Sequence, residues 1–339
     1  MGKFYGGIDL HSNNNVIVII NASGETTLER RVPNELPVIL KTLEPFAQEL
    51  VGLVVESTYN WYWLVDDLME HRYKVHLANT NAIQQYDGLK CTDDKTDARW
   101  LAELLRLGIL KEGYIYPKAE RGIRDLLRKR MRLVQNRTQC GLSLKNLFSR
   151  QLGRNLPYKS LDILDDKRVQ ELFADPFVAQ SALSSLAIIR CLDQQIRHIV
   201  NYLAPVLKLK PEYQALLSVE GIGKILAATI SLETGNIRRF KGVGNFASYC
   251  RCVRSERTSN KKKKGKNNTK NGNKYLSWAF IEAAEFARRY NEQARRFYQR
   301  KAAKTYPVIA RKALAHKLAR ASYFIMRDQV PFDAKRAFG

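Results

Sequence analysis

The sequence predicts an α/β amino-terminal domain with a mixed sheet, followed by two mostly helical regions. Apolar alternation and helical spacing over residues 3–105 give the element order β-β-β-α-β-α-β-α. Residues 118–209 carry apolar repeats typical of two long helices. Residues 1–112 hold 11 Lys and Arg against 16 Asp and Glu, a net charge of −5, so the chain's total of +24 leaves +29 on the remainder. An acidic domain thus precedes a strongly basic one.

The first three predicted strands form an antiparallel meander, with an asparagine-rich turn between the first two. A helix, a strand, a second helix, a short strand and a third helix follow. The predicted strands are Lys3–Asp9, Val16–Ile20, Thr26–Val32, Val51–Glu56 and Lys74–Ala78, and the predicted helices are Leu36–Leu50, Trp61–His71 and Thr92–Leu105.

Composition places the chain among globular proteins, because 45% hydrophobic residues over 339 positions support sizeable cores. No apolar run approaches the ~20 residues of a membrane span, and the first residues lack a signal-peptide pattern. Five scattered cysteines suit a reducing compartment. The pair Cys250 and Cys252 is a weak zinc signal, which we discount. We therefore expect a soluble intracellular protein.

The third predicted helix carries two carboxylates on its packing face. At 3.6 residues per turn, Asp94, Asp97 and Ala98 continue into Leu101 and Leu105 as one stripe. Carboxylates on such a face must become neutral, pair with bases or bind a cation. Helix capping combined with an ordinary ion pair explains this helix as well as a metal site does.

Two further acids favour the metal site. Asp9 ends the first predicted strand and Glu56 ends the fourth. With a central first strand, both carboxylates would lie near the amino end of the helix that carries Asp94 and Asp97, because the ends of parallel strands gather at one edge of a sheet. Singly, Asp9 reads as a turn residue and Glu56 as a solvated strand end. Four acids together indicate a divalent cation.

The two long helices, predicted at 118–150 and 179–209, repeat apolar residues as a helical seam does. The repeat residues are Leu126, Leu133, Cys140 and Leu147 in the first helix, and Ile189, Leu192, Ile196, Ile199 and Leu203 in the second. This pattern indicates an antiparallel or intersubunit coiled coil. A helical hairpin that buries its own apolar faces explains it equally well, and basic residues from Arg128 to Arg132 would then be its solvated side.

Beyond these helices, Gly221 and Gly223 permit a tight turn just before Lys224. The backbone N–H groups of such a turn can meet a phosphate, as in a helix-hairpin-helix element that binds a DNA backbone. A simple interhelical turn is the alternative reading.

A basic segment then runs from Arg254 to Lys274 with 9 Lys or Arg, one acid and no apolar residue. Such a segment cannot pack, so we expect an irregular loop that is mobile without its partner and orders on phosphates. Its candidate contacts are Arg257, Lys261, Lys262, Lys263, Lys264, Lys266, Lys270 and Lys274, and its hydroxyl groups are Ser255, Thr258 and Ser259. A solvated or targeting run is the alternative. Helices at 275–290 and 307–326 close the chain.

Several motifs together resemble one protein family. They are Gly7-Ile8-Asp9, Val55-Glu56-Ser57-Thr58, Asp94-Lys95-Thr96-Asp97-Ala98-Arg99, Glu220-Gly221-Ile222-Gly223, the segment from Arg251 to Asn260, Lys274 to Phe280, and Pro331-Phe332-Asp333. This set resembles the DEDD transposases of bacterial insertion sequences, family one hundred and ten, described as bridge-RNA-guided serine recombinases. The resemblance runs essentially from end to end.

The resemblance implies three domains. Residues 1–115 would form an RNase H-like domain of the Holliday-junction-resolvase type, residues 116–210 a coiled-coil spacer, and residues 211–339 a mostly α-helical transposase domain with a nucleophilic serine. The carboxylate tetrad maps to Asp9, Glu56, Asp94 and Asp97, and the serine maps to Ser259. Asp93 leaves the third acid ambiguous, although the spacing to Asp97 favours Asp94. Ser255 remains a weaker serine candidate.

The same resemblance implies a transposase that cleaves and rejoins DNA through a covalent phosphoserine, with Mg²⁺ or Mn²⁺ held by the tetrad. A noncoding bridge RNA would choose the site, which suits a chain with abundant basic surface and no base-reading motif. A homo-oligomer, dimer or tetramer, is expected in the bacterial cytoplasm near the nucleoid. A metal-dependent endonuclease that uses water is the leading alternative. A nucleic-acid scaffold, or a sugar-kinase-like ATPase, is a further one, although glycine-rich phosphate loops are not evident around Asp9.

Overall fold

The computed structural model describes residues 3–83, 93–155, 157, 164–253, 257–260, 262–265 and 271–339. The chain divides into two compact units, one made of residues 1–118 and 255–271, the other of residues 119–254 and 272–339. The three-domain division at 115 and 210 stays a prediction. Among the described residues, no helix combines the length and the apolar character needed to cross a bilayer.

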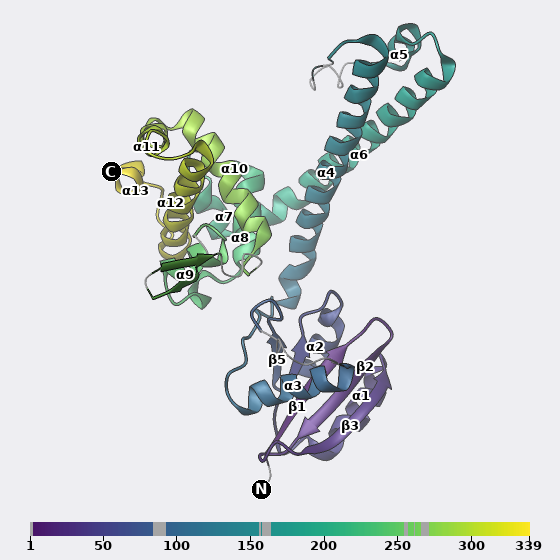
Figure 1. Ribbon diagram of the computed structural model, residues 1–339, viewed down its shortest axis with the longest axis vertical. Helices are drawn as coiled ribbons and strands as arrows, with labels where there is room; N and C mark the ends of the chain where they lie inside the picture. The colour runs from purple at the N-terminus through teal and green to yellow at the C-terminus, as the bar shows by residue number, and fades with distance from the viewer. Residues whose placement is uncertain are drawn as a thin grey trace. The chain divides into compact units, whose positions relative to one another are not determined.

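The first unit is built on a five-stranded mixed sheet with the order β3-β2-β1-β4-β5 (Figure 1). The meander of β1, β2 and β3 is antiparallel, and β4 and β5 run parallel to β1 and to each other. The predicted α/β class, the meander and the central first strand are therefore confirmed. The strands are β1 Phe4–Leu10, β2 Asn14–Ile20, β3 Thr26–Pro33, β4 Leu50–Glu56 and β5 Val75–Ala78.

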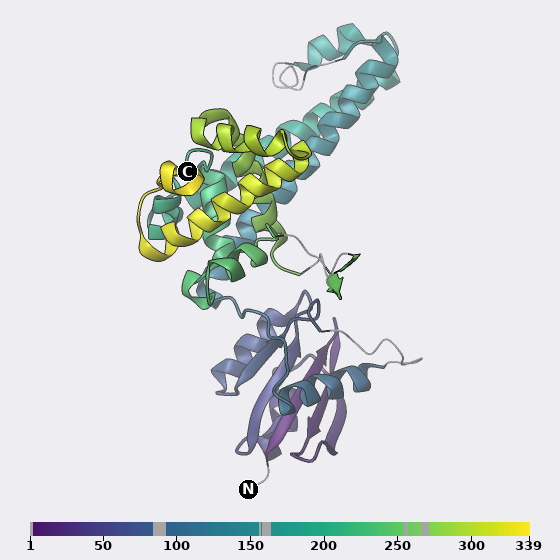
Figure 2. The same cartoon turned by 60° about the vertical axis from the view of Figure 1, so that its left-hand side comes forward.

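Helices cover both faces of this sheet. On one face, α1 (Leu36–Leu43) and α2 (Trp61–Glu70) enclose a core that includes Ile8, Leu53 and Val55. The other face is covered by α3 (Asp94–Arg106), as the two views show (Figures 1 and 2). Ala98 and Ala102 of α3 pack against the opposite side of β2. The helix predicted at 36–50 ends early at Leu43, followed by a 3₁₀ turn at Glu44–Phe46, because a proline cannot continue the helical hydrogen bonds.

The backbone of β1 touches α3 directly at Gly7. A Cβ atom at this position would lie 1.9 Å from the carbonyl oxygen of Ala98 and 2.8 Å from the amide nitrogen of Ala102. Only glycine leaves room for that approach. The strand that ends near Asp9 and the helix that begins at Asp94 are therefore in backbone contact.

The second unit begins with two long helices that run side by side, α4 (Lys118–Leu152) and α6 (Pro176–Lys208), joined through the short α5 (Asp166–Leu172) (Figures 1 and 2). The two long helices were predicted and α5 was not. Toward the α5 end, Leu147 and Ile189 of the predicted repeats are buried in one core, whereas Leu133, Leu192 and Ile196 midway along the helices are only half buried. A coiled coil between subunits remains a prediction.

The remaining helices form the carboxyl-terminal bundle, whose core includes Phe246, Phe280, Leu314 and Leu318. The helices predicted at 275–290 and 307–326 are present as α10 and α12. The elements are α7 Pro211–Leu216, α8 Lys224–Thr234, a 3₁₀ turn Ile237–Arg239, α9 Val243–Tyr249, α10 Lys274–Tyr290, α11 Glu292–Ala302, α12 Pro307–Asp328 and α13 Ala334–Phe338.

One member of the basic run on α4 is not a solvated residue. Arg128 Nε lies 2.6 Å from Oε1 of Glu233, whose side chain is only 2% exposed. Asn273, the N-cap of α10, donates to the other oxygen of Glu233 at 2.7 Å. The guanidinium of Arg128 also lies over the ring of Tyr275, 4.5 Å from its centre. The reading of Arg128 as solvated is therefore wrong, and this network links α4 to the end of the basic segment and the start of α10.

The basic segment also contains structure that the sequence reasoning missed. The strands β6 (Arg257–Ser259) and β7 (Lys262–Gly265) pair as an antiparallel hairpin, with Ser259 opposite Lys262. Asn260 adopts a left-handed conformation with φ of 54°, which asparagine tolerates in tight hairpin turns. The expectation that this segment lacks regular structure is thus wrong for residues 257–265. Positions 254–256, 261 and 266–270 lie outside the described residues.

Candidate metal centre

The alternation of side chains along β1 and β4 places Asp9 and Glu56 on the same face of the sheet. Ile8 and Val55 are register partners that point into the core beneath α1 and α2. The residues that follow them, Asp9 and Glu56, therefore point to the face covered by α3. Both strands are parallel and end at the same edge, as the sequence predicted.

Asp9 and Glu56 form a hydrogen-bonded carboxyl pair. Asp9 is 5% exposed, and burial raises its pKa above the usual range. Burial, the hydrogen bond to Asp9 and the charge of Asp9 together raise the pKa of Glu56 to about 7. Two adjacent carboxyls cannot both ionise at low cost in a partly buried site, so the pair holds a proton near neutral pH unless a cation replaces it.

Asp97 extends this pair from α3. Burial raises the pKa of Asp97, and the negative charges of Asp9 and Asp94 raise it further. Asp97 and Glu56 line one cleft of about 230 Å³ together with Thr80, Ile83, Trp100 and Leu101. The helix that carries Asp97 thus presents it to the carboxyl pair.

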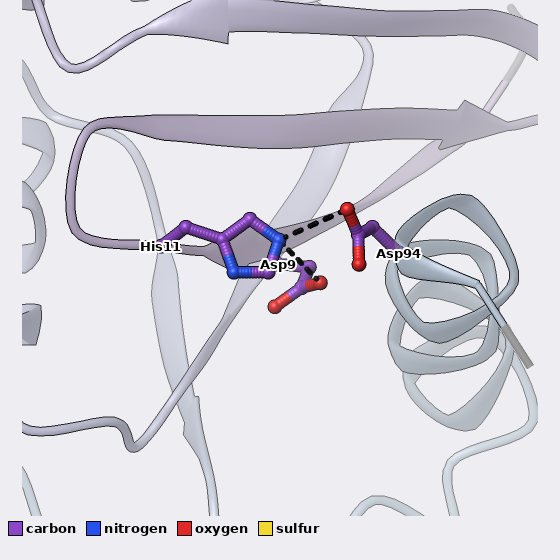
Figure 3. Close-up of side chains that lie close together, drawn as sticks. All are labelled: Asp9, His11 and Asp94. Carbon is purple, nitrogen blue, oxygen red and sulfur yellow. Dashed lines mark ion pairs between the residues drawn. The ribbon is translucent and has the colours of Figure 1, made fainter.

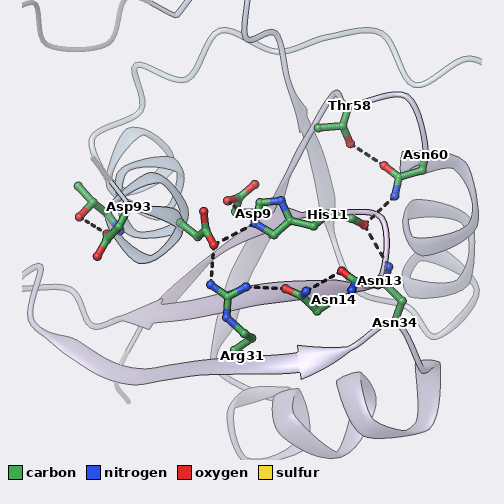
Figure 4. A network of polar contacts seen from close by, with 11 residues as sticks. Asp9, His11, Asn13, Asn14, Arg31, Asn34, Thr58, Asn60 and Asp93 are labelled. Atoms are coloured by element: carbon green, nitrogen blue, oxygen red, sulfur yellow. Dashed lines mark hydrogen bonds and ion pairs between the residues drawn. The ribbon is translucent and has the colours of Figure 1, made fainter. Parts of the chain in front are cut away.

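The carboxylates of Asp93 and Asp94 point to different partners, although the residues are adjacent. Asp93 caps α3, since its Oδ1 accepts from the backbone N–H and the hydroxyl of Thr96 at 2.8 and 2.7 Å (Figure 4). Asp94 instead contacts Arg31 Nη2 at 2.5 Å, and this arginine lowers the pKa of Asp94. The structure therefore directs Asp94, and not Asp93, toward the other acids.

His11 lies between the acids, and sequence reasoning missed it. Its Nε2 atom is 3.3 Å from Oδ2 of Asp9 and 3.2 Å from Oδ2 of Asp94 (Figure 3). Within the described part of the chain, these three are the one group of metal-ligating side chains whose ligand atoms all lie within 4.8 Å of one another. In an extended chain, side chains two positions apart point to the same face, so the spacing between Asp9 and His11 was a signal available in the sequence.

The backbone of His11 is held from three directions. Its N–H donates to the carbonyl of Asn14 at 2.9 Å. Its carbonyl accepts from the side chains of Asn34 at 3.0 Å and Asn60 at 2.8 Å, and Thr58 supports Asn60 (Figure 4). These contacts come from β2, from the residue after β3 and from the N-cap of α2, so the imidazole is attached to a rigid point of the fold.

The candidate phosphate turn lies between α7 and α8. Gly221 has a φ of +109°, and a Cβ there would lie 2.5 Å from the amide nitrogen of Ala287 in α10. Gly223 is the N-cap of α8 and Lys224 its first residue. The close approach of this turn to the backbone of α10 thus accounts for Gly221. A cleft of about 590 Å³ beside the turn is lined by Gly223, Lys224 and the ring of Phe286.

The structure describes the candidate serine and most of the candidate lysines only in part, or not at all. The backbone of Ser259 belongs to β6, but its side chain and those of Arg257 and Lys263 lie outside the description, as do Ser255, Lys261, Lys266 and Lys270. Lys262 and Lys264 are exposed on β7. Lys274 starts α10 with its Nζ 5.3 Å from the centre of the Tyr275 ring.

Cys250 and Cys252, the weak zinc signal that we discounted, have the surroundings of core residues. Cys250 and Cys252 are buried at 0% and 5% exposure, and burial raises the pKa of the Cys252 thiol to about 12. Buried cysteines of this kind commonly act as small apolar residues of a core.

Comparison with known proteins identifies the family. A DEDD transposase model of IS110 type matches residues 6–152, which include all four acids of the candidate site. A second model, described as transposase IS116/IS110/IS902 family, matches residues 213–299, which include the glycine turn and the β6–β7 hairpin. The chain is a member of the IS110 family of transposases. The resemblance inferred from the motifs is confirmed at this level.

A curated relative supports the assignment. The chain is 27% identical over 203 residues to a putative transposase, y4qE, of Sinorhizobium fredii (strain NBRC 101917 / NGR234). The alignment covers 60% of this chain and 50% of the relative, so the chain spans about half the length of that curated protein. The matched family is that of the DEDD transposases, which is distinct from the serine recombinases. The expectation of a serine recombinase is therefore wrong at the level of the family.

Proposed function

We propose that this protein is an insertion-sequence transposase that cleaves and rejoins DNA at a divalent-metal site held by Asp9, Glu56, Asp94 and Asp97. The observation that carries the proposal is the gathering of these acids, from two strand ends and one helix start, in a chain of the IS110 family. DNA is the substrate that the family description implies.

The acids suit a hard divalent cation such as Mg²⁺ or Mn²⁺, because they offer carboxylate oxygens and are destabilised by their own proximity. Such an ion, when bound, supplies charge neutralisation at the phosphate and polarises the reacting oxygens. Within the chain, Arg31 keeps Asp94 ionised, and the cleft beside Glu56 and Asp97 offers space for a phosphodiester.

We propose further that Ser259 is the nucleophile, with Ser255 as the weaker candidate. A bond would form between the serine Oγ and phosphorus as the bond from phosphorus to the leaving sugar oxygen breaks. The serine proton would pass to a base and the leaving oxygen would take a proton. This covalent ester preserves the phosphodiester energy, so strands can be rejoined without ATP. The position of Ser259 beside the turn of a lysine-rich hairpin supports this assignment.

Recognition of nucleic acid would fall to the basic remainder of the chain. Its net charge of +29 favours phosphate backbones, with Gly221, Gly223 and Lys224 as further candidate contacts. We propose that a noncoding bridge RNA supplies sequence choice by base pairing, and that the protein acts as a homo-oligomer, dimer or tetramer, at the nucleoid in the cytoplasm. The catalytic site would be completed within one chain or between protomers.

A metal-dependent endonuclease of the resolvase type is the second candidate, because the acid cluster alone can support attack by water. A suicide DNA substrate separates the two. The recombinase should leave a covalent protein–DNA adduct that mass spectrometry maps to residue 259. Ser259→Ala should abolish the adduct, Ser255→Ala should retain it, and Asp97→Ala should abolish all cleavage while nucleic-acid binding survives.

Cleavage without an adduct would favour the endonuclease. An adduct that persists in Ser259→Ala would reject Ser259 and transfer the role to Ser255 or another residue. Full activity of Asp97→Ala with Mg²⁺ would reject the acid tetrad itself.

A further inference from the structure

We propose that His11 is a nitrogen ligand of the divalent-metal site and biases this site toward Mn²⁺ over Mg²⁺. The inference rests on the metal site of the proposed function and adds to it a residue outside the DEDD tetrad. It makes the site a mixed centre of carboxylate oxygens and one imidazole nitrogen.

The distances around His11 suit one coordination sphere. An octahedral ion with metal–ligand bonds of about 2.1 Å holds adjacent ligand atoms about 3 Å apart. His11 Nε2 lies 3.3 Å from the Asp9 oxygen and 3.2 Å from the Asp94 oxygen. All three ligand atoms lie within 4.8 Å of one another, so one ion placed among them could bind all three.

The imidazole is positioned before any ion arrives. Its Nε2 atom is shielded from solvent and is directed at the two carboxylates rather than outward (Figure 3). The three backbone hydrogen bonds of His11 to Asn14, Asn34 and Asn60 fix the point from which the ring extends (Figure 4). A ligand held in this way loses little conformational entropy when it binds.

The nitrogen donor determines which ion the site should prefer. Carboxylates alone suit Mg²⁺ and Mn²⁺, whereas an imidazole ligand favours transition metals over Mg²⁺, which binds oxygen almost exclusively. One imidazole among carboxylates should thus shift selectivity toward Mn²⁺ without removing Mg²⁺ binding.

Electron spin echo spectroscopy of bound Mn²⁺ tests the proposal, because a coordinated ¹⁴N nucleus modulates the echo. The full-length wild type loaded with Mn²⁺ should show ¹⁴N modulation that changes to a ¹⁵N pattern when only the histidines are ¹⁵N-labelled. This labelled sample tests the ligand without any substitution. His11→Gln should lose the modulation and bind Mn²⁺ about tenfold or more weakly, with Mg²⁺ affinity changed much less.

His71→Gln is the matched control, since His71 is an exposed histidine at the end of α2 in the same unit. It should keep both modulation and affinity. Bound Mn²⁺ without histidine modulation in the wild type, or modulation that persists in His11→Gln, would overturn the role of His11 while the metal site stands. Failure of the wild type to bind either ion would overturn both the inference and the metal-dependent function.

Discussion

The carboxyl pair of Asp9 and Glu56 should make metal-free protein less stable as the pH rises, and Glu56→Gln should remove this effect. Folding raises the pKa of Glu56 from 4.5 to about 7. At pH below 4.5 the Glu56 carboxyl is protonated in both the folded and the unfolded state, so it does not change the free energy of unfolding. Between these two values the unfolded chain ionises while the folded chain must keep the proton, so the folded state loses stability across that window.

The size of the effect follows from the shift. One pKa unit corresponds to about 1.4 kcal/mol, so the full shift would be worth about 3 kcal/mol. Because the Glu56 side chain is only partly buried, solvent screening reduces this to about 1 to 2 kcal/mol. Glutamine mimics the protonated acid and can still donate to Asp9. In chelator at about pH 8, Glu56→Gln should therefore raise the free energy of unfolding by about 1 to 2 kcal/mol.

Urea unfolding of the full chain, followed by tryptophan fluorescence, measures this difference. Three of the four tryptophans, Trp61, Trp63 and Trp100, lie in the same unit as the pair. At about pH 4 the variant and the wild type should agree. Glu35→Gln, an exposed control at the N-cap of α1, should bring no gain in stability at either pH, because it removes only a solvated charge that favours the helix start. A stability difference that does not depend on pH, or a variant less stable than wild type at about pH 8, would refute the reasoning.

Two further predictions concern the basic segment and the long helices. Replacing Lys261, Lys262, Lys263 and Lys264 with Gln should flatten the dependence of log affinity for nucleic acid on log salt, by about 0.7 to 0.9 for each phosphate that the variant no longer neutralises, as measured by filter binding. An unchanged slope would show that these lysines do not bind phosphates. Charged substitutions at the half-buried Leu133 and Ile196 should lower the mass measured by light scattering if these helices join protomers, whereas Leu142→Glu, at a half-exposed position of α4, should not. A folded protein of unchanged mass would make the seam internal.

The order of elements in the first unit could be predicted because its strands and helices carry strong periodic patterns. Alternation along β1 and β4 sufficed to place Asp9 and Glu56 on one face. The β6–β7 hairpin was missed because its strands have no apolar face, and its hydrogen bonds are set by the backbone and the turn at Asn260. Helices as short as α5 and α9 have too few turns for a period to show.

The surroundings of the acids could not be predicted for a different reason. The contact between Arg31 and Asp94 joins residues 63 positions apart, and a charge pair across that distance leaves no mark in local sequence. The same holds for Asn34 and Asn60, which look like ordinary turn and cap residues until the fold brings them to the carbonyl of His11. His11 itself was detectable, since it follows Asp9 by two positions at a strand end.

The bare backbone contact at Gly7 has a consequence for how such chains can diverge. Because α3 rests directly on β1, that contact fixes the spacing between Asp9 and the acids of α3, and the length of chain between β5 and α3 does not. Relatives should therefore tolerate insertions and deletions in that connection without losing the alignment of their acids. Alanine should not occur at position 7 in these relatives. Its methyl group would push β1 and α3 apart, and the acids that these two elements carry would move apart with them.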